Sequence, residues 1–126
     1  MIHGIGTDIA DCARFETMYA RYGVHLAERM LSEHEFTEFR TIKHPARFIA
    51  KHFAAKEAFA KAVGSGLRDP VSLRRISIIH DNLGKPELMF DEVLLTHLAQ
   101  LGIIGHHLSI SDEQNMVVAF VVLESV

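Results

Sequence analysis

The stretch P-A-R-F-I-A-K-H-F-A-A-K-E-A-F-A-K-A-V-G-S-G, residues 45–66, decides the fold. It predicts one helix, because Pro45 suits the first helical turn and the closing Gly64-Ser65-Gly66 supplies a left-handed stop. At about 100° per residue, apolar side chains lie nearly all round this helix. A helix with such a pattern is buried, so we expect it at the centre of the molecule.

Glu57 interrupts the apolar surface of this helix. Its neighbours on the helical wheel include Ala50, Ala54, Phe53 and Lys61. Small side chains let other backbone come close, so we expect the carboxylate to lie in a crevice, where it needs a cation or strong hydrogen bonds. Lys61, one turn further on, is one candidate partner and a metal ion is another. Glu57 and Lys61 can equally form an ordinary i,i+4 pair on a solvated face.

Length, charge and cysteine content limit the possible classes of protein. A chain of 126 residues is expected to form a single domain with one core, and its net charge of −3 argues against a general nucleic-acid binder. Cys12 is the only cysteine, which fits a reducing cytoplasm. Asp8 and Asp11 interrupt the early apolar run, so no secretory signal is recognisable, and no apolar run reaches the ~18 residues of a membrane span. We therefore expect a cytoplasmic protein that binds neither nucleic acid nor membranes.

The beginning of the chain, residues 1–10, predicts a strand. Gly4 and Gly6 remove side chains at positions where another backbone can approach. Asp8 is unusual in a strand that is otherwise apolar. One explanation is that it caps a turn or the following helix.

Three short helical segments are expected next, at residues 12–22, 24–31 and 33–42. The last one opens with a capping box, S-E-H-E. On the first, Arg14, Met18 and Arg21 fall on one face. Two arginines with a methionine between them suit an acidic, partly apolar partner helix, although the same face can simply be solvated.

The segment after the central helix predicts a hairpin, a helix and a closing hairpin. The expected elements are strands at residues 76–79 and 87–90, a helix at 91–101, and strands at 107–111 and 116–122. The helix has a leucine stripe, formed by Leu94, Leu95, Leu98 and Leu101, that we expect in the core. The last apolar run predicts a strand that is buried on both faces. This order of elements is typical of an α+β domain.

Four stretches of the sequence resemble one known family. Residues 4–9, G-I-G-T-D-I, resemble the opening G-I-G-x-D-I/V motif of holo-[acyl-carrier-protein] synthases. Residues 53–62, F-A-A-K-E-A-F-A-K-A, match that family's F-x-x-K-E-A-x-x-K helix. Residues 84–86 and 107–111 resemble its later G-K-P and H-x-S-[I/L]-S segments. The resemblance therefore extends, in order, over nearly the whole chain.

The resemblance implies a 4′-phosphopantetheinyl transferase. Its fold would be one α+β domain over residues 1–126, with a long central helix packed on a small antiparallel sheet. Such enzymes move the phosphopantetheine arm of coenzyme A onto a serine of apo acyl carrier protein and release adenosine 3′,5′-bisphosphate, in support of fatty acid biosynthesis. The family needs Mg²⁺ and works as a homotrimer, with each active site between two subunits.

The resemblance also implies roles for individual residues. Asp8 and Glu57 would be the ligands of Mg²⁺, and the pyrophosphate of coenzyme A would complete the shell. Lys61 would bind a phosphate oxygen and stabilise the departing bisphosphate, which makes these three residues the expected catalytic set. A metal-bound water held by a carboxylate is the expected general base for the carrier serine.

Binding residues for coenzyme A and the carrier protein follow from the same resemblance. Asn82, Gly84, Lys85 and Pro86 would border the adenosine, and His107, Ser109 and Ser111 would contact the nucleotide from the neighbouring subunit. The face formed by Arg14, Met18 and Arg21 would dock the acidic carrier protein.

The chain departs from the family pattern at two places. Many members read F-L-A-G-R-F before the K-E core, whereas residues 48–53 here read F-I-A-K-H-F, so that His52 replaces the arginine and Lys51 the glycine. If that arginine binds a coenzyme A phosphate, Arg47, Lys51 or His52 would take its place. The family's S-x-S-H segment ends here in Asp112 instead of the histidine.

Two other functions remain compatible with the sequence. A family member that has lost turnover would be a non-catalytic trimer that binds coenzyme A or another nucleotide, and only the two departures favour it. A small metal-dependent phosphohydrolase is the second, but the chain lacks the cluster of three or more acids expected for a two-metal site.

Overall fold

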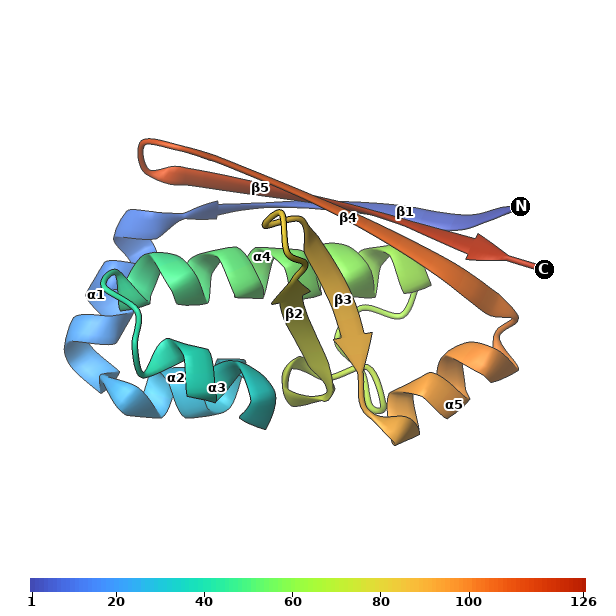
Figure 1. Cartoon of the computed structure of the whole chain (residues 1–126), viewed down its shortest axis with the longest axis horizontal. Coiled ribbons are helices and arrows are strands. Elements are labelled where there is room, and N and C mark those ends of the chain that lie inside the picture. The colour runs from blue at the N-terminus through green and yellow to red at the C-terminus, as the bar shows by residue number, and fades with distance from the viewer.

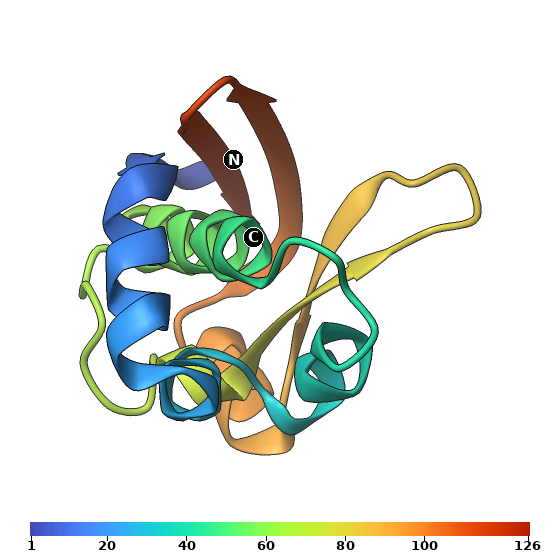
Figure 2. The same ribbon diagram turned by 90° about the vertical axis from the view of Figure 1, so that its left-hand side faces the viewer.

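The computed structural model describes all residues from 1 to 126. A three-stranded antiparallel sheet with the order β1-β5-β4 covers one side of helix α4, and the short helices lie on the other side (Figure 1). Strands β2 and β3 form a separate two-stranded hairpin, which projects away from the body in Figure 2. The elements are β1 (Ile2–Asp11), α1 (Cys12–Tyr22), α2 (Val24–Met30), α3 (Glu33–Phe39), α4 (Pro45–Val63), the 3-10 turn η1 (Leu73–Arg75), β2 (Ile76–His80), β3 (Pro86–Phe90), α5 (Glu92–Gln100), β4 (Ile103–Glu113) and β5 (Met116–Ser125).

Helix α4 is the centre of the molecule, as its sequence predicts. It begins at Pro45 and ends at Gly64, whose φ of 101° is left-handed and whose N–H donates to the carbonyl of Ala60. Of its 19 residues, 13 are buried. The apolar side chains on all sides of α4 are therefore covered by the sheet on one side and by α1, β2 and the short helices on the other.

Strand β1 lies directly on α4, because two of its residues have no side chain. A Cβ atom at Gly4 would overlap the carbonyl oxygen of Ala62, and one at Gly6 would overlap the carbonyl oxygen of Ala58. Both glycines are thus needed for the close approach of the two backbones, which confirms the expectation from the sequence. The packing fixes the strand against the last two turns of the helix.

The face of the sheet that points away from α4, the outer face, is uncovered and carries apolar side chains of β1 and β5. In β5, Val117, Ala119 and Val121 are fully buried, while Val118 and Phe120 are 39% and 42% exposed. The prediction that this strand is buried on both faces is therefore wrong for the chain taken alone. The helices cover only one face of the sheet, so the alternate apolar side chains remain in contact with solvent.

Some element boundaries and one core stripe also differ from the predictions. Helix α3 ends at Phe39, three residues early, and β4 is longer than the predicted strand at both ends. On α5, Leu94 and Leu98 are buried but Leu95 is exposed, as is Leu101 just after the helix, because only one side of this short helix packs against the body. No helix of the structure combines the length and the apolar character needed to cross a membrane.

Candidate active site

Asp8 and Lys61 meet where β1 lies on α4. Asp8 falls on the same face of the strand as Gly4 and Gly6, so its side chain points toward the helix. The Lys61 ammonium donates to Asp8 Oδ1 at 3.2 Å and to the carbonyl of Thr7 at 2.9 Å. Lys61 therefore pairs with Asp8 and not with Glu57.

Asp8 does not cap the following helix, because that role belongs to Asp11. The Asp11 carboxylate accepts from the backbone N–H of Ala13 at 2.9 Å and forms the N-cap of α1. The local explanation for an acid in the first strand is thus excluded, and Asp8 is left with its cation Lys61 at the surface of α4.

Glu57 lies beside the same pair and is partly buried. Burial raises the pKa of its carboxyl group, and the negative charge of Asp8 raises it further, while Lys61 acts in the opposite direction. Gly6 packs on the carbonyl of Ala58, the next residue along the helix, so the strand passes this turn closely. Asp8 and Glu57, which are 49 positions apart in the sequence, therefore lie close enough to repel each other, and we call them the carboxylate pair.

The carboxylate pair has the donor set of a Mg²⁺ site that the substrate completes. No group of three or more histidine, cysteine, aspartate or glutamate side chains in the structure could hold a metal by itself. Mg²⁺ is usually held by one or two carboxylates, with phosphate oxygens and waters as the other ligands. A cation between Asp8 and Glu57 would also remove the repulsion that raises the pKa of Glu57.

A second feature is a cavity of about 530 Å³ between α4, the connection before it and β2. Its basic and imidazole side chains are Lys43, His44, Arg47, Lys51, His52 and His80, and we call it the basic pocket. All three residues that the sequence offers in place of the family's arginine, Arg47, Lys51 and His52, therefore line one cavity. Lys43, His44 and His80 were not among the predicted site residues. Their only signal in the sequence is the pair Lys43-His44 just before the proline of the central helix.

Asp112 forms ion pairs with two of the cationic side chains of this pocket, Arg47 and Lys51. Its Oδ2 lies 2.9 Å from Arg47 Nη1 and 3.8 Å from Lys51 Nζ, and Arg47 also donates to the carbonyl of Gln114. Asp112 is the residue that replaces the family's histidine. In this chain the departure thus places a carboxylate on the two side chains that could bind a phosphate.

His52 lies in the wall of the basic pocket but is only 3% exposed. Its Nδ1 contacts the carboxylate of Glu35, a residue of α3. Glu35 therefore takes the Nδ1 atom, and Nε2 has no hydrogen-bond partner within the chain.

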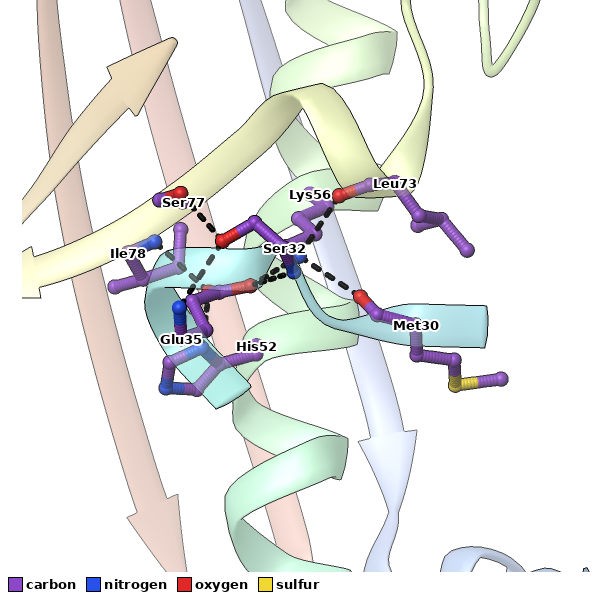
Figure 3. A network of polar contacts seen from close by, with 8 residues as sticks. All are labelled: Met30, Ser32, Glu35, His52, Lys56, Leu73, Ser77 and Ile78. Carbon is purple, nitrogen blue, oxygen red and sulfur yellow. Dashed lines mark hydrogen bonds and ion pairs between the residues drawn. The ribbon is translucent and has the colours of Figure 1, made fainter. Parts of the chain in front are cut away.

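Glu35 belongs to a group of buried polar residues that sequence reasoning missed (Figure 3). The group consists of Ser32, Glu35, His52, Lys56 and Ser77, and we call it the buried network. The capping box predicted the contact between Glu35 and the N-terminus of α3, and the structure confirms it. Burial alone would raise the pKa of Glu35, but the hydrogen bond from His52, the charges of Lys56 and His52 and the hydrogen bond from Lys56 lower it to about 2.

The predicted adenosine-binding residues lie on two other elements. Asn82, Gly84, Lys85 and Pro86 form the turn of the β2–β3 hairpin and its last step into β3. Asp81 organises this turn, because its carboxylate accepts from the backbone N–H groups of Leu83 and Lys85 at 2.8 and 2.9 Å.

Three further residues of the predicted site lie on the outer face of the sheet. His107, Ser109 and Ser111 of β4 are exposed and pair in register with Val122, Phe120 and Val118. His107 Nε2 also contacts Glu124 Oε1 at 2.6 Å. These three side chains point away from α4, so they do not join the carboxylate pair of their own chain.

The predicted docking residues lie on α1. Arg14 and Arg21 are exposed, and neither forms an ion pair with an acid of this chain; each guanidinium lies near a ring of the same helix, Phe15 and Tyr22 respectively. Met18 is half-buried and packs against the core. Since α1 begins four residues after Asp8, its arginines lie on the element that directly follows the strand of Asp8.

The family model of the 4′-phosphopantetheinyl transferase superfamily matches residues 4–121. The chain belongs to this superfamily. The holo-[acyl-carrier-protein] synthase of Nitrosospira multiformis is 50% identical over 124 residues, which cover 98% of this chain and 99% of the relative. The phosphopantetheinyl transferase family inferred from the G-I-G-T-D-I and F-A-A-K-E-A-F-A-K-A motifs is thus confirmed.

Solved structures of phosphopantetheinyl transferases share the fold over the whole chain. The crystal structure of the Neisseria meningitidis holo-[acyl-carrier-protein] synthase has a TM-score of 0.96 at 48% identity and covers 99% of this chain and 100% of its own. A Bacillus anthracis holo-(acyl-carrier-protein) synthase, solved in complex with CoA (3′,5′-ADP), has a TM-score of 0.83 at 39% identity and covers 100% and 99%. The predicted α+β fold, with a long central helix on a small antiparallel sheet, is confirmed. The roles of the single site residues stay predictions.

Proposed function

We propose that this chain transfers the 4′-phosphopantetheine arm of coenzyme A to a serine of an apo acyl carrier protein and releases adenosine 3′,5′-bisphosphate. The observation that carries the proposal is the carboxylate pair, two repelling acids brought together by the glycines of β1. The similarity to holo-[acyl-carrier-protein] synthases, one of them solved with CoA, supports the choice of substrates.

Asp8 and Glu57 would hold Mg²⁺ together with the pyrophosphate of coenzyme A. When bound, the ion supplies the positive charge that phosphoryl transfer requires at the pyrophosphate. The carrier serine oxygen bonds to the phosphorus next to pantetheine, and the bond from that phosphorus to the bridging oxygen breaks. The serine proton passes to the carboxylate pair, directly or through a water. The electron pair of the broken bond stays on the leaving adenosine bisphosphate.

Lys61 would stabilise the charge that develops on the leaving group. Its ammonium already lies at the carboxylate pair, where it is held by Asp8 and the carbonyl of Thr7. A cation aimed at the place where negative charge grows lowers the barrier more than it strengthens substrate binding. Replacement of Lys61 by alanine is therefore expected to lower kcat more than the affinity for coenzyme A.

The basic pocket would receive a phosphate of the adenosine end. Arg47 and Lys51 provide the charges, and both can exchange Asp112 for a phosphate because their contacts with it lie at the surface. The hairpin turn at Asn82, Gly84, Lys85 and Pro86 would border the adenosine. This part of the proposal explains why basic side chains gather in one cavity of a chain with a net charge of −3.

The outer face of the sheet would join copies of this chain into a homotrimer. Ile5 and Ile9 are 60% and 63% exposed there and pair in register with Val122 and Val118 of the next strand. An apolar surface of this kind is typical of an interface. His107, Ser109 and Ser111 lie on the same face, so they would contribute to the site of a neighbouring copy.

The carrier protein would dock on Arg14, Met18 and Arg21 of α1. Exposed arginines without an acidic partner suit an acidic surface, and electrostatic steering would favour the encounter. A cytoplasmic location, which the single free Cys12 fits, and a place in fatty acid biosynthesis belong to the same proposal.

Mass spectrometry of an acyl carrier protein tests the proposed reaction. The purified chain, Mg²⁺ and coenzyme A are expected to add the mass of one phosphopantetheine group to an apo carrier protein. Glu57→Gln serves as the inactive control, and Glu92→Gln, at an exposed position of α5, as the active one. No mass shift on several carrier proteins, while calorimetry still detects coenzyme A, would favour a non-catalytic binding protein instead.

A further inference from the structure

The Glu35 carboxylate is the most densely coordinated group of the molecule. It is only 1% exposed, and it accepts from the backbone N–H groups of Ser32 and Ile78 at 2.9 Å each and from Lys56 Nζ at 2.5 Å. His52 Nδ1 is its fourth partner. These donors come from the start of α3, from β2 and from α4, so one side chain joins three elements (Figure 3).

Lys56 completes the coordination on the α4 side. Its ammonium is fully buried and also donates to the carbonyl oxygens of Met30 at 2.8 Å and Leu73 at 2.9 Å. Burial lowers the pKa of Lys56, and the charge of Glu35 opposes that effect. No buried side-chain nitrogen or oxygen atom of the structure lacks a partner. The buried polar side-chain atoms of the network are therefore all paired within the chain.

Two partners of Glu35 line the basic pocket. His52 belongs to the α4 wall, and Ile78 belongs to the β2 wall. The imidazole of His52 and the backbone N–H of Ile78 both donate to the same carboxylate oxygen, Oε2. This one atom therefore links the α4 wall to the β2 wall. The hydroxyl groups of Ser32 and Ser77, which are 2.6 Å apart, add a second connection between the start of α3 and β2.

The hairpin needs such connections. Two-stranded hairpins are marginally stable on their own, and β2 and β3 pair only with each other. A buried ion pair often adds little stability compared with apolar side chains of the same volume, but its directed hydrogen bonds fix one arrangement of the elements. Glu35 therefore adds directed contacts that fix how β2 lies against α3 and α4 at the basic pocket.

We propose that Glu35 is a positioning residue, which holds the α4 and β2 walls of the basic pocket at the separation that the adenosine bisphosphate part of the substrate requires. The inference rests on the proposed function of the pocket. Glu35 touches neither the substrate nor the carboxylate pair. Its loss should therefore affect the binding of the nucleotide end and spare the chemical step at Asp8 and Glu57.

The kinetics of Glu35→Gln test this separation of binding from chemistry. We expect KM for coenzyme A to rise about tenfold and kcat at saturation to change by less than about threefold. Calorimetry with adenosine 3′,5′-bisphosphate alone should give a matching rise in Kd. An unchanged KM and Kd, or an equal fall in kcat and kcat/KM, would overturn the inference.

Two further variants separate positioning from loss of stability. Leu94→Ala creates a cavity under α5, away from the pocket, and should lower thermal stability while KM stays at the wild-type value. The double variant Glu35→Gln with Lys56→Met removes the buried charges together, so it should fold even if Glu35→Gln does not. It should still show the raised KM, and a wild-type KM in this variant would contradict the proposal.

The failure of the proposed function would look different. In that case the wild-type chain itself would transfer no phosphopantetheine, whatever residue stands at position 35. An active wild type with an unaffected Glu35→Gln variant would leave the enzyme assignment intact and remove only the positioning role.

Discussion

Lys56 and Glu57 are neighbours on α4, but they belong to two regions with opposite electrostatics. Lys56 is fully buried in a network where each buried polar side-chain atom has a partner, and its positive ammonium group balances the negative charge of Glu35. Glu57 is partly exposed, has no ion-pair partner within this chain, and is repelled by Asp8. The first region holds the fold in one arrangement, whereas the second has free energy to gain from a cation. One helix can serve both regions because consecutive residues lie about 100° apart.

The largest expected effect concerns the carboxylate pair. Asp8→Asn and Glu57→Gln should each lower kcat/KM by about 10²–10³-fold or more, because each removes a charge that acts on the reacting phosphate. Glu57→Gln should not lower the stability of the metal-free protein, since it removes a partly buried charge that Asp8 repels. Asp8→Asn also loses the ion pair with Lys61, so its stability should fall by at most about 1 kcal/mol. Paired assays of transfer and urea unfolding check this prediction. A Glu57→Gln variant that loses stability along with activity would mean that the pair is structural.

The buried network should make the stability of the protein depend on pH in acid. The pKa of Glu35 falls from 4.5 to about 2 on folding, so its contribution to stability is complete above pH 4.5 and is lost as the pH falls toward 2. The shift corresponds to roughly 3 kcal/mol of stability. The free energy of unfolding, measured with urea between pH 5 and 2, should therefore fall more steeply with decreasing pH for the wild type than for Glu35→Gln. Equal slopes would show that Glu35 is not ionised in the folded protein.

A smaller effect is expected at the surface of α1. Arg14→Glu should raise KM for the carrier protein about tenfold by placing a like charge at the docking face, and leave KM for coenzyme A unchanged. Glu92→Lys, which changes the charge on α5, is the matched control. If both KM values rise together in Arg14→Glu, the docking assignment is wrong.

The smallest effect is expected at Asp112. Its ion pairs with Arg47 and Lys51 lie at the surface, where such contacts are worth at most about 1 kcal/mol. Asp112→Asn removes a competitor for the phosphate and should tighten the binding of adenosine 3′,5′-bisphosphate by about two- to fivefold. Calorimetry at low salt measures this change. Weaker binding would mean that Asp112 orients Arg47 for the ligand instead of competing with it.

The region around the carboxylate pair could be predicted from the sequence because its signals are local. Pro45 and Gly64 delimit the helix, the alanines indicate a close neighbour, and Gly4 and Gly6 mark the strand that approaches. An acid on each of these segments is visible as an exception to an apolar pattern. Their meeting at one site was predicted from the resemblance to holo-[acyl-carrier-protein] synthases, because the local signals also allowed a cap at Asp8 and a surface pair at Glu57.

The buried network could not be predicted in the same way. Glu35 lies 17 and 21 positions from His52 and Lys56, and a capping box explains its presence without any distant partner. Lys56 looks like an ordinary helical lysine until the positions of α2 and η1 are known. The exposed outer face of β5 has a similar origin, because an apolar run does not say whether both of its faces are covered by the same chain.

The sharing of one divalent cation by Asp8 and Glu57 is measured most directly by calorimetry with Mn²⁺ in the presence of coenzyme A. The account predicts one ion per site for the wild type. It predicts that Asp8→Asn and Glu57→Gln each weaken Mn²⁺ binding strongly, and that the double variant is little weaker than either single one, as expected for two ligands of one ion. Wild-type affinity for Mn²⁺ in either single variant would contradict it.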